Sequence, residues 1–383
     1  MEKVEVYLDY AATSAIRPPE VVEAVTRFLT DVGATPGRSG HSRSIAAGRV
    51  MLRCRQLLAR LLGITGDPGR ITFQHNATVA INTAILGLVS PGGRVVRTRF
   101  DHNAVLRSVA SLQDSGVRES VIEVGAKGEV DLAQTAELLQ RGVPPRLVVV
   151  PHASNVTGTV LPVRRIADLA HEAGALLLVD LAQTAGHVRV DLNTLGADLA
   201  AFTGHKGLLG PQGTGGLWVR EGIELRPLFF GGTGSDSLPR AMPEVYPDHL
   251  EAGTQNSPGL AGLAAGVEWI LDHRVEALAA REQQLKQQLL DGLSGLPDVR
   301  IVSTNQPGDV ALVTMVHNRF PSDELALRVE RSHGIQGRPG LHCAPDTHAV
   351  LGTLRDGAFR LSIGWATTGV EIDQVIEAIR ALE

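Results

Sequence analysis

The chain has 383 residues, of which 43% are hydrophobic and 20% are charged, as is typical of a soluble globular protein with room for two domains. The net charge of −5 gives no electrostatic reason to expect nucleic acid or a membrane surface as the main partner. The sequence shows no signal peptide and no apolar segment of membrane-spanning length, and two cysteines cannot form a disulfide framework, so we expect a cytoplasmic protein.

Strand and helix patterns alternate between about residues 18 and 254. A helical pattern with one apolar face covers residues 45–62. Further helices are predicted over residues 77–88 and 162–172, and short apolar runs predict strands at 70–74, 93–98, 146–151, 175–180, 216–219 and from residue 199 onward. This alternation predicts an α/β fold with a mostly parallel sheet that is covered by helices.

The pattern changes after residue 254. Helices are predicted over residues 258–272 and 274–293, and strands near residues 299–302, 311–316 and 358–364. We assign residues 16–257 to a large domain and residues 258–383, together with residues 1–15, to a smaller α+β domain. A strand around residues 6–8 is expected to pack near that smaller domain.

Two strands each lead to a charged residue. Asp180 closes the run that starts at Ala175, and Lys206 follows the run that starts at Leu199. Ligands of open α/β sheets lie at the carboxyl ends of the strands, and this pair suits pyridoxal phosphate, whose aldehyde reacts with lysine and whose ring nitrogen pairs with a carboxylate. Each residue alone has a simpler interpretation, a turn or cap for the aspartate and a solvated side chain for the lysine.

A phosphate site is expected where residues 75–78 lead into a helix, because a helix N-terminus offers free N–H groups to an anion. Ala77 and Thr78 lie there, although Thr78 is also an ordinary N-cap residue. Thr203 and His205 flank Lys206 and are candidates for further phosphate donors. We interpret the glycine-rich segment 207–216 as a tight turn, since it lacks the spacing of a phosphate loop.

Three polar residues follow strands near these positions. Asn155 and Gln183 are candidates to bond the cofactor's phenolic oxygen or, more simply, to fix loops. His102 is a candidate to stack on a flat ring, although a single loop histidine is more often a surface residue. We assign no metal ligands.

The two cysteines differ in their surroundings. Cys54 shares one helical face with Val50, Leu57 and Leu61, which is typical of a buried hydrophobe. Cys343 follows His342 in a segment bounded by glycine and proline, where a histidine neighbour would favour a thiolate. Spacing alone leaves a reactive thiol and an inert one equally open.

These segments together resemble the class V, fold-type I pyridoxal-phosphate enzymes, and specifically the cysteine desulfurases. The resemblance covers nearly the whole chain. It is carried by Tyr7-Leu-Asp-Tyr-Ala-Ala-Thr13, Arg38-Ser-Gly-His41, His75-Asn-Ala-Thr78, Asp101-His-Asn-Ala104, Ser154-Asn-Val-Thr-Gly158, Val179-Asp-Leu-Ala-Gln183, Thr203-Gly-His-Lys206, Glu251-Ala-Gly-Thr-Gln-Asn256, Gly340-Leu-His-Cys-Ala-Pro345 and Phe359-Arg-Leu-Ser362.

The resemblance implies a role for each candidate residue around the cofactor. Lys206 would hold the cofactor covalently and Asp180 would pair with its ring nitrogen, while His102 would stack on the ring. Gln183 would bond the phenolic oxygen, and Asn155 would lie near ring and substrate. The phosphate would be held by Ala77, Thr78, Thr203 and His205, with Thr254 contributed by the second subunit of a homodimer.

The resemblance also implies the reaction. Arg360 would bind the α-carboxylate of L-cysteine or L-selenocysteine, and the Cys343 thiolate would take the sulfur as a persulfide and pass it to an acceptor, for which a protein is a candidate. The short loop around Cys343 and the segment 38–41 resemble the SufS-type branch. Tyr10 and residues 364–368 depart from the family pattern, which would affect the substrate side.

Other functions on the same fold remain open at this point. A selenocysteine lyase, another class V aminotransferase or a cysteine or cystine β-lyase are the enzymatic alternatives, and the aminotransferase and β-lyase reactions need no nucleophilic thiol. A non-enzymatic alternative is a catalytically silent scaffold on the same fold, and an intact pair of Lys206 and Asp180 argues against it.

Overall fold

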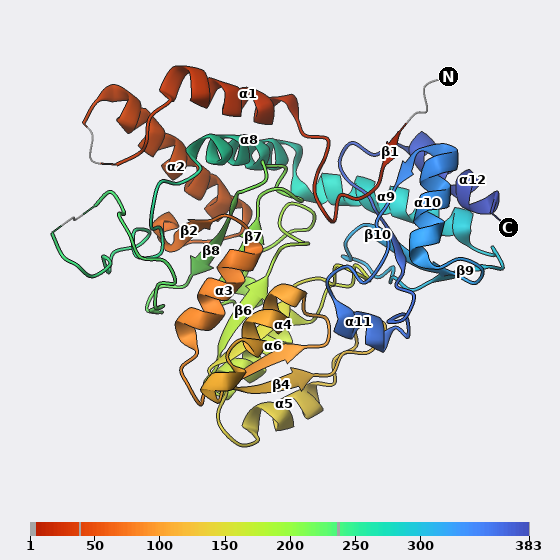
Figure 1. The fold of residues 1–383 in the computed structure, drawn as a ribbon, viewed down its shortest axis with the longest axis horizontal. Coiled ribbons are helices and arrows are strands. Elements are labelled where there is room, and N and C mark those ends of the chain that lie inside the picture. The colour runs from red at the N-terminus through yellow and green to blue at the C-terminus, as the bar shows by residue number, and fades with distance from the viewer. Residues whose placement is uncertain (1–4, 38–39, 236–237, 383) are drawn as a thin grey trace.

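A seven-stranded sheet, here called the large sheet, lies at the centre of the larger part of the molecule (Figure 1). The computed structural model describes residues 5–37, 40–235 and 238–382. The strand order is β2-β8-β7-β6-β5-β3-β4, and every neighbouring pair is parallel except those that β8 makes with β2 and β7. The strands are β2 (Ile71–Gln74), β3 (Arg94–Thr98), β4 (Arg118–Ile122), β5 (Leu147–Pro151), β6 (Leu176–Asp180), β7 (Leu199–Thr203) and β8 (Gly215–Val219). The predicted α/β fold with a mostly parallel sheet is confirmed.

Both faces of the large sheet are buried, which explains the continuous apolar runs in its strands. Val148 and Val150 of β5 face one apolar core, and Val149 between them faces the other. Helices α3 and α4 cover the second core, and α2, α6 and α8 cover the first. The helices of this part are α1 (Pro19–Arg27), α2 (Ser42–Leu61), α3 (Ala77–Leu88), α4 (Asn103–Ala110), α5 (Leu132–Gln140), α6 (Val163–Glu172), α7 (Leu192–Leu195) and α8 (Ser257–His273), with short helical turns at Phe28–Val32, Pro68–Arg70 and Gln113–Ser115.

A second, three-stranded antiparallel sheet, here called the small sheet, has the order β12-β10-β9. Its core contains Val6 and Leu8 from the N-terminal segment beside residues of α9, α10 and α12. The elements are β9 (Val299–Ile301), β10 (Leu312–His317), β12 (Phe359–Ser362), α9 (Val275–Leu293), α10 (Ser322–His333), α11 (Pro345–Val350) and α12 (Gly369–Arg380).

The N-terminal strand belongs with this C-terminal part, as expected. β1 (Val6–Tyr7) pairs in parallel with β11 (Ile335–Gln336), and Figure 1 shows it, coloured red, among the blue elements of the chain's end. Leu8 accepts a hydrogen bond from the amide of Ser362 through its carbonyl oxygen, at 2.7 Å. The residues that follow β1 therefore run directly alongside β12.

The packing of α8 bears on the division into domains. Leu263 and Val267 of α8 lie in the same core as the large-sheet residues Leu177 and Phe202. Along α9, by contrast, Leu285 lies in the core of the small sheet. The division at residue 258 remains a prediction, and we propose from this packing that the passage between the two domains lies in α9.

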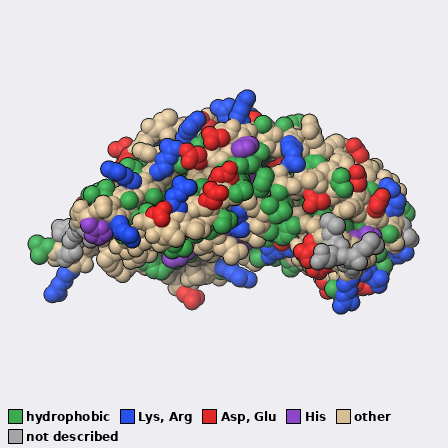
Figure 2. All heavy atoms as spheres, turned by 90° about the horizontal axis from the view of Figure 1, so that it is seen from above, with side chains coloured by type: hydrophobic (Ala, Val, Ile, Leu, Met, Phe, Trp, Pro, Cys, Tyr) green, Lys and Arg blue, Asp and Glu red, His purple; other side chains and the backbone are tan. Residues whose placement is uncertain are grey.

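No helix in the described part of the chain has the length and apolar character needed to cross a membrane. On the face shown in Figure 2, acidic and basic side chains are interspersed, so that face offers no continuous basic surface for nucleic acid.

Candidate active site

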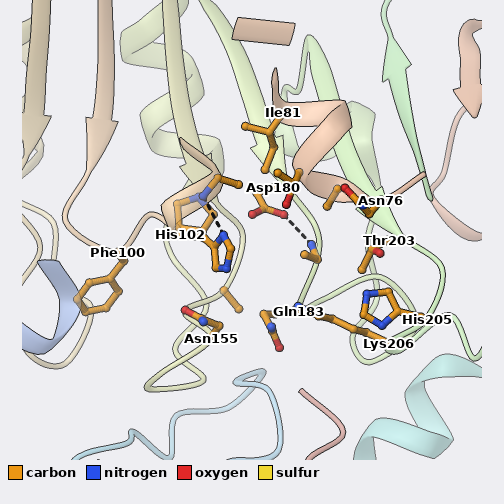
Figure 3. Close-up of a pocket in the computed structure, with 16 residues that line it drawn as sticks. Asn76, Ile81, Phe100, His102, Asn155, Asp180, Gln183, Thr203, His205 and Lys206 are labelled. Atoms are coloured by element: carbon orange, nitrogen blue, oxygen red, sulfur yellow. Dashed lines mark hydrogen bonds between the residues drawn. The ribbon is translucent and has the colours of Figure 1, made fainter. Parts of the chain in front are cut away.

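A pocket of about 560 Å³ opens at the carboxyl ends of β5, β6 and β7, against the N-termini of α3 and α4 (Figure 3). Parallel strands end at one edge of the sheet, so polar residues that follow different strands meet there. Most of the predicted site residues line this pocket, namely Ala77, Thr78, His102, Asn155, Asp180, Gln183, Thr203, His205 and Lys206.

Asp180 and Lys206 form the electrostatic centre of the pocket. Asp180 is buried, which raises the pKa of its carboxyl group, and one of its oxygens accepts a hydrogen bond from the amide of Ala182 at 2.8 Å. Burial lowers the pKa of the Lys206 amine to about 8, against the opposing attraction of Asp180. An amine with such a pKa is partly neutral near pH 7–8, and the neutral form is the one that attacks carbonyl groups and accepts protons.

The loop that carries Lys206 is held from both sides. The side chain of Ser14 donates to the carbonyl of Lys206 at 2.9 Å, and its amide donates to the carbonyl of His205 at 2.8 Å. Gly207 packs so closely on the chain that a β-carbon there would lie 2.5 Å from the carbonyl oxygen of Ala185. The glycine that follows Lys206 therefore permits a close backbone approach, in addition to the turn predicted from the glycine-rich segment.

One end of the pocket suits an anion. Asn76, not Thr78, caps α3, because its side-chain oxygen accepts a hydrogen bond from the amide of Val79 at 3.0 Å. Thr78 lies at the second helical position, where the backbone N–H has no acceptor within the helix. The hydroxyl of Thr203 is buried and has no hydrogen-bond partner among the described residues, so it is available to a bound group. The side of the pocket with Asn76, Thr203 and His205 thus fits a phosphate (Figure 3).

The two histidines of the pocket are neutral. Burial lowers the pKa of His102 and that of His205 to about 4, and the nearby Lys206 adds to both shifts. His102 is the N-cap of α4, and its Nδ1 accepts a hydrogen bond from the amide of Ala104 at 3.0 Å, so Nε2 carries the proton. His102 therefore presents an uncharged ring to the pocket from a helix N-terminus, where the sequence suggested a loop.

Arg360, the residue predicted to bind the substrate's carboxylate, does not line the pocket but is joined to it through Asn155. One Nη of Arg360 donates to the backbone oxygen of Asn155 at 2.8 Å, and the other pairs with Asp9 at 2.9 Å. The Nε atom is buried without a partner in the described structure. Sequence reasoning gave Asp9 no role, although it lies within the Tyr7–Thr13 motif.

Cys343 lies on a short loop between β11 and α11 and is half-buried. The loop is fixed by two hydrogen bonds, from the amide of Asn103 to the carbonyl of Cys343 at 2.7 Å and from the side chain of Asn155 to the carbonyl of His342 at 2.6 Å. Because Asn155 lines the pocket and Asn103 follows His102, these bonds place the Cys343 loop against the pocket wall.

The group beside the Cys343 thiol is not the one expected from the sequence. The ring of His342 is buried, both of its nitrogens are hydrogen-bonded, and burial lowers its pKa to about 2, so it supplies no positive charge. The guanidinium of Arg338 lies instead 3.8 Å from the sulfur. Arg338 was missed because it reaches the thiol through the pairing of residue 338 with Arg360, which no local pattern reveals. Cys54 is fully buried as predicted, and burial raises its pKa to about 12.

Tyr10 and Gly364, the two departures from the family pattern, do not line the pocket as expected. They border a separate small cavity together with Trp365. A β-carbon at Gly364 would lie 2.3 Å from the ring of Tyr10, so the tyrosine ring occupies the space that any larger residue at 364 would need. Tyr10 and Gly364 are therefore one packing adjustment, and the effect of the departures at residues 10 and 364–368 on the substrate side stays a prediction.

Thr254 is exposed and lies in a different groove, beside residues such as Gly37 and Met51. A single chain thus does not bring Thr254 to its own pocket, and its role for a second subunit stays a prediction. Of the motif at residues 38–41, Arg38 and Ser39 lie outside the described residues.

Residues 6–375 match the model of the Aminotransferase class-V family, and the chain belongs to that family. Within it, the relatives that it resembles along almost its whole length bear the name cysteine desulfurase. It is 33% identical to a "Probable cysteine desulfurase" of Methanothermobacter thermautotrophicus, with 98% of this chain and 94% of the relative covered. It is 31% identical to a cysteine desulfurase of Haloferax volcanii, with 98% and 89% covered.

Solved structures agree with this assignment. The apo structure of a cysteine desulfurase from Thermococcus onnurineus has a TM-score of 0.90 at 28% identity and covers 99% of this chain and 94% of its own. The cysteine desulfurase CsdA of Escherichia coli has a TM-score of 0.87 at 28% identity, with the same coverage. The fold-type I architecture expected from the sequence is confirmed.

Proposed function

We propose that this protein is a cysteine desulfurase that converts L-cysteine into L-alanine and takes the sulfur onto Cys343 as a persulfide. The single observation that carries the proposal is the placement of the Cys343 thiol, beside Arg338 and hydrogen-bonded through its loop to the wall of the pocket that contains Lys206 and Asp180. An aminotransferase or a β-lyase has no use for a thiol in that position. The names of the relatives support the same conclusion.

The pocket fits pyridoxal 5'-phosphate by the chemistry of its donors. Lys206 is the residue to bind the aldehyde, Asp180 the residue to keep the ring nitrogen protonated, and the start of α3 with Thr203 and His205 the place for the phosphate. His102 offers its flat neutral ring, and Gln183, whose amide now donates to the carbonyl of Ala11 at 3.2 Å, offers a donor for the phenolic oxygen. When bound, the cofactor supplies an electron sink for carbanion chemistry at the substrate's Cα.

The chain's own groups then account for the reaction. Lys206, with its lowered pKa, takes the proton from the substrate's Cα. The Cys343 thiolate attacks the substrate's Sγ, the Cβ–Sγ bond breaks with its electron pair passing to carbon, and protonation of carbon completes L-alanine. One sulfur atom moves from cysteine to Cys343, so atoms and electrons balance without an added oxidant.

Arg360 is the residue that we assign to the substrate's carboxylate. Its Nε is buried and is the guanidinium nitrogen without a hydrogen-bond partner in the described structure, whereas the two Nη atoms bond to Asp9 and to Asn155. A guanidinium group whose other donors are already fixed loses little further freedom when a carboxylate binds, which favours a defined orientation of the substrate.

We propose a homodimer in which Thr254 completes the phosphate site of the partner subunit. Thr254 is exposed beside a groove, and the neighbouring segment exposes the apolar residues Phe229, Phe230 and Val245, whose exposed fractions are 56%, 71% and 73%. Large apolar side chains exposed near such a groove accord with a protein interface there.

The finer assignments also stay proposals. The shortness of the Cys343 loop favours a SufS-like enzyme, in which a protein acceptor collects the sulfur at the loop, and L-selenocysteine is an alternative substrate for the same geometry. A cytoplasmic location accords with two unpaired cysteines among the described residues.

Incubation of the protein with L-cysteine and a reductant tests the function when alanine, pyruvate and sulfide are measured together. We expect alanine and sulfide in equal amounts, and we expect Cys343→Ser to retain the cofactor but lose alanine formation. Cys54→Ala is the matched control and should keep its activity. Pyruvate in place of alanine would establish the β-lyase reaction instead, and full alanine formation by Cys343→Ser would refute the role of Cys343.

A further inference from the structure

A chain of hydrogen bonds runs behind Cys343 through three buried side chains. His342, His348 and Thr353 expose 3%, 0% and 5% of their surfaces. The His342 Nδ1 lies 3.1 Å from the His348 Nε2, and the His348 Nδ1 lies 2.7 Å from the Thr353 hydroxyl. At the other end, the His342 Nε2 lies 2.9 Å from the carbonyl oxygen of Arg338. We call these three side chains the His–His–Thr relay.

The carbonyl oxygen of Arg338, which His342 contacts, fixes the direction of every hydrogen bond in the relay. A carbonyl oxygen only accepts, so the His342 Nε2 must donate, and the Nδ1 of a neutral His342 must then accept from His348. The Nδ1 of His348 in turn accepts the hydroxyl proton of Thr353, whose other acceptor, the carbonyl of His348, is at 3.5 Å. Burial lowers the pKa of His342 to about 2 and that of His348 to about 4, in agreement with two neutral rings.

The relay ends on the turn that presents the nucleophile. His342 and Cys343 both have left-handed backbone angles, with φ of 51° and 57°, a conformation that side chains other than glycine adopt only under constraint. The carbonyl that closes the relay belongs to Arg338, whose guanidinium contacts the Cys343 sulfur. The relay therefore supports both the strained turn and the cation beside the thiol.

We propose that His348 and Thr353 are positioning residues for Cys343, which act through His342 to hold the left-handed turn and Arg338 in place. The inference rests on the proposed function in taking Cys343 as the reacting thiol. His348 and Thr353 are buried and are joined to the Cys343 turn only through His342 in the relay, so their role does not require contact with the substrate or the cofactor. Their effect must appear in the sulfur-transfer step and in the reactivity of the thiol.

The test compares Thr353→Val, which removes the hydroxyl at nearly constant shape, with Thr353→Ser, which keeps it. Thr135→Val in α5 is the control, because Thr135 is equally buried and its hydroxyl donates to a carbonyl, that of Asp131, in an element remote from Cys343. Two readouts are measured, kcat and KM for alanine formation and the rate at which iodoacetamide alkylates Cys343 without cysteine present. Cys54 is fully buried, so alkylation of the folded protein reports on Cys343 alone.

We expect Thr353→Val to lower kcat and the alkylation rate by about fivefold each, the rate equivalent of one net hydrogen bond. KM and cofactor content should stay within about twofold of the wild type, because ground-state binding does not use the relay. Thr353→Ser and Thr135→Val should match the wild type. A double variant with His348→Phe should lose no more than His348→Phe alone, since both changes interrupt one chain.

Equal behaviour of Thr353→Val and Thr353→Ser would overturn the proposal, as would additive losses in the double variant. A loss that appeared in KM and in the unfolding midpoint, with alkylation unchanged, would reduce the relay to a structural contact. If the wild type formed no alanine, the proposed function would fail, and the alkylation comparison would still decide whether the relay positions Cys343.

Discussion

Replacing Gly364 by alanine should destabilise the protein through Tyr10. The added β-carbon would lie 2.3, 2.5 and 2.6 Å from three ring atoms, whereas ordinary contacts lie at 3.4–4 Å, so a displacement of about 1 Å is required. Tyr10 is only 1% exposed, so its ring is enclosed by the surrounding side chains. Overpacking of this kind lowers the free energy of unfolding by about 1–3 kcal/mol.

Urea unfolding followed by tryptophan fluorescence suits this measurement, because Trp365 adjoins Gly364 and packs edge-on against Trp269 with ring centroids 4.9 Å apart. Gly66→Ala is the control, since a β-carbon there meets nothing within 4 Å. That variant should change stability by no more than about 0.5 kcal/mol.

The same clash predicts that substitutions at positions 10 and 364 have coupled effects on the free energy of unfolding. In a Tyr10→Ala background the clash disappears, so Gly364→Ala should cost much less there, with a coupling free energy of about 1–3 kcal/mol. The KM for L-cysteine should stay unchanged in Gly364→Ala, because neither residue lines the pocket. Unchanged stability of Gly364→Ala, or a changed KM at unchanged stability, would refute this account of the two residues.

Four further outcomes are expected. Lys206→Ala should lose the visible absorbance of the cofactor, and borohydride reduction of the wild type should leave the pyridoxyl group on Lys206; mass spectrometry that places it on another lysine would contradict the site. Because burial holds the Lys206 pKa at about 8, below the ordinary 10.5, the neutral amine fraction rises as pH increases through that value. Capture of pyridoxal phosphate by the cofactor-free protein should therefore accelerate between about pH 7 and pH 9, and a flat profile by stopped-flow absorbance would argue against the lowered pKa. Thr254→Ala should speed cofactor loss with little effect on urea unfolding; a monomer by ultracentrifugation that keeps full cofactor would count against a shared phosphate site. Cys54→Ala should keep activity while losing about 1–2 kcal/mol of unfolding free energy from the small cavity it creates, and a large loss of alanine formation would show that Cys54 does more than pack.

The sequence predicted those features whose signals are local. The helix over residues 77–88 has the predicted bounds, because an apolar pattern and a capping residue define it within one segment. The polar residues of the pocket, including Asp180 and Lys206, were predicted because the carboxyl ends of parallel strands lie at one edge of the sheet. The residues that follow each strand are therefore informative even without a structure.

The features that sequence reasoning missed depend on contacts between distant segments. Arg338 reaches Cys343 because residue 338 bridges to Arg360, and His342 is neutral because His348 and a carbonyl use both of its nitrogens. The sequence also named Thr78 rather than Asn76 as the possible cap of α3, since both residue types cap helices and only the backbone angles distinguish them.

The segment from Asp9 to Ser14 has a consequence for the order in which the protein can assemble during synthesis. Asp9 pairs with Arg360, 351 positions later, and Ser14 bonds the loop of Lys206, 192 positions later. All strands of the large sheet lie between residues 71 and 219, so that sheet can form while the last hundred residues are still being made. Asp9 and the residues that follow it must then wait for β12, and we expect the pocket to become competent only when this segment has met β12.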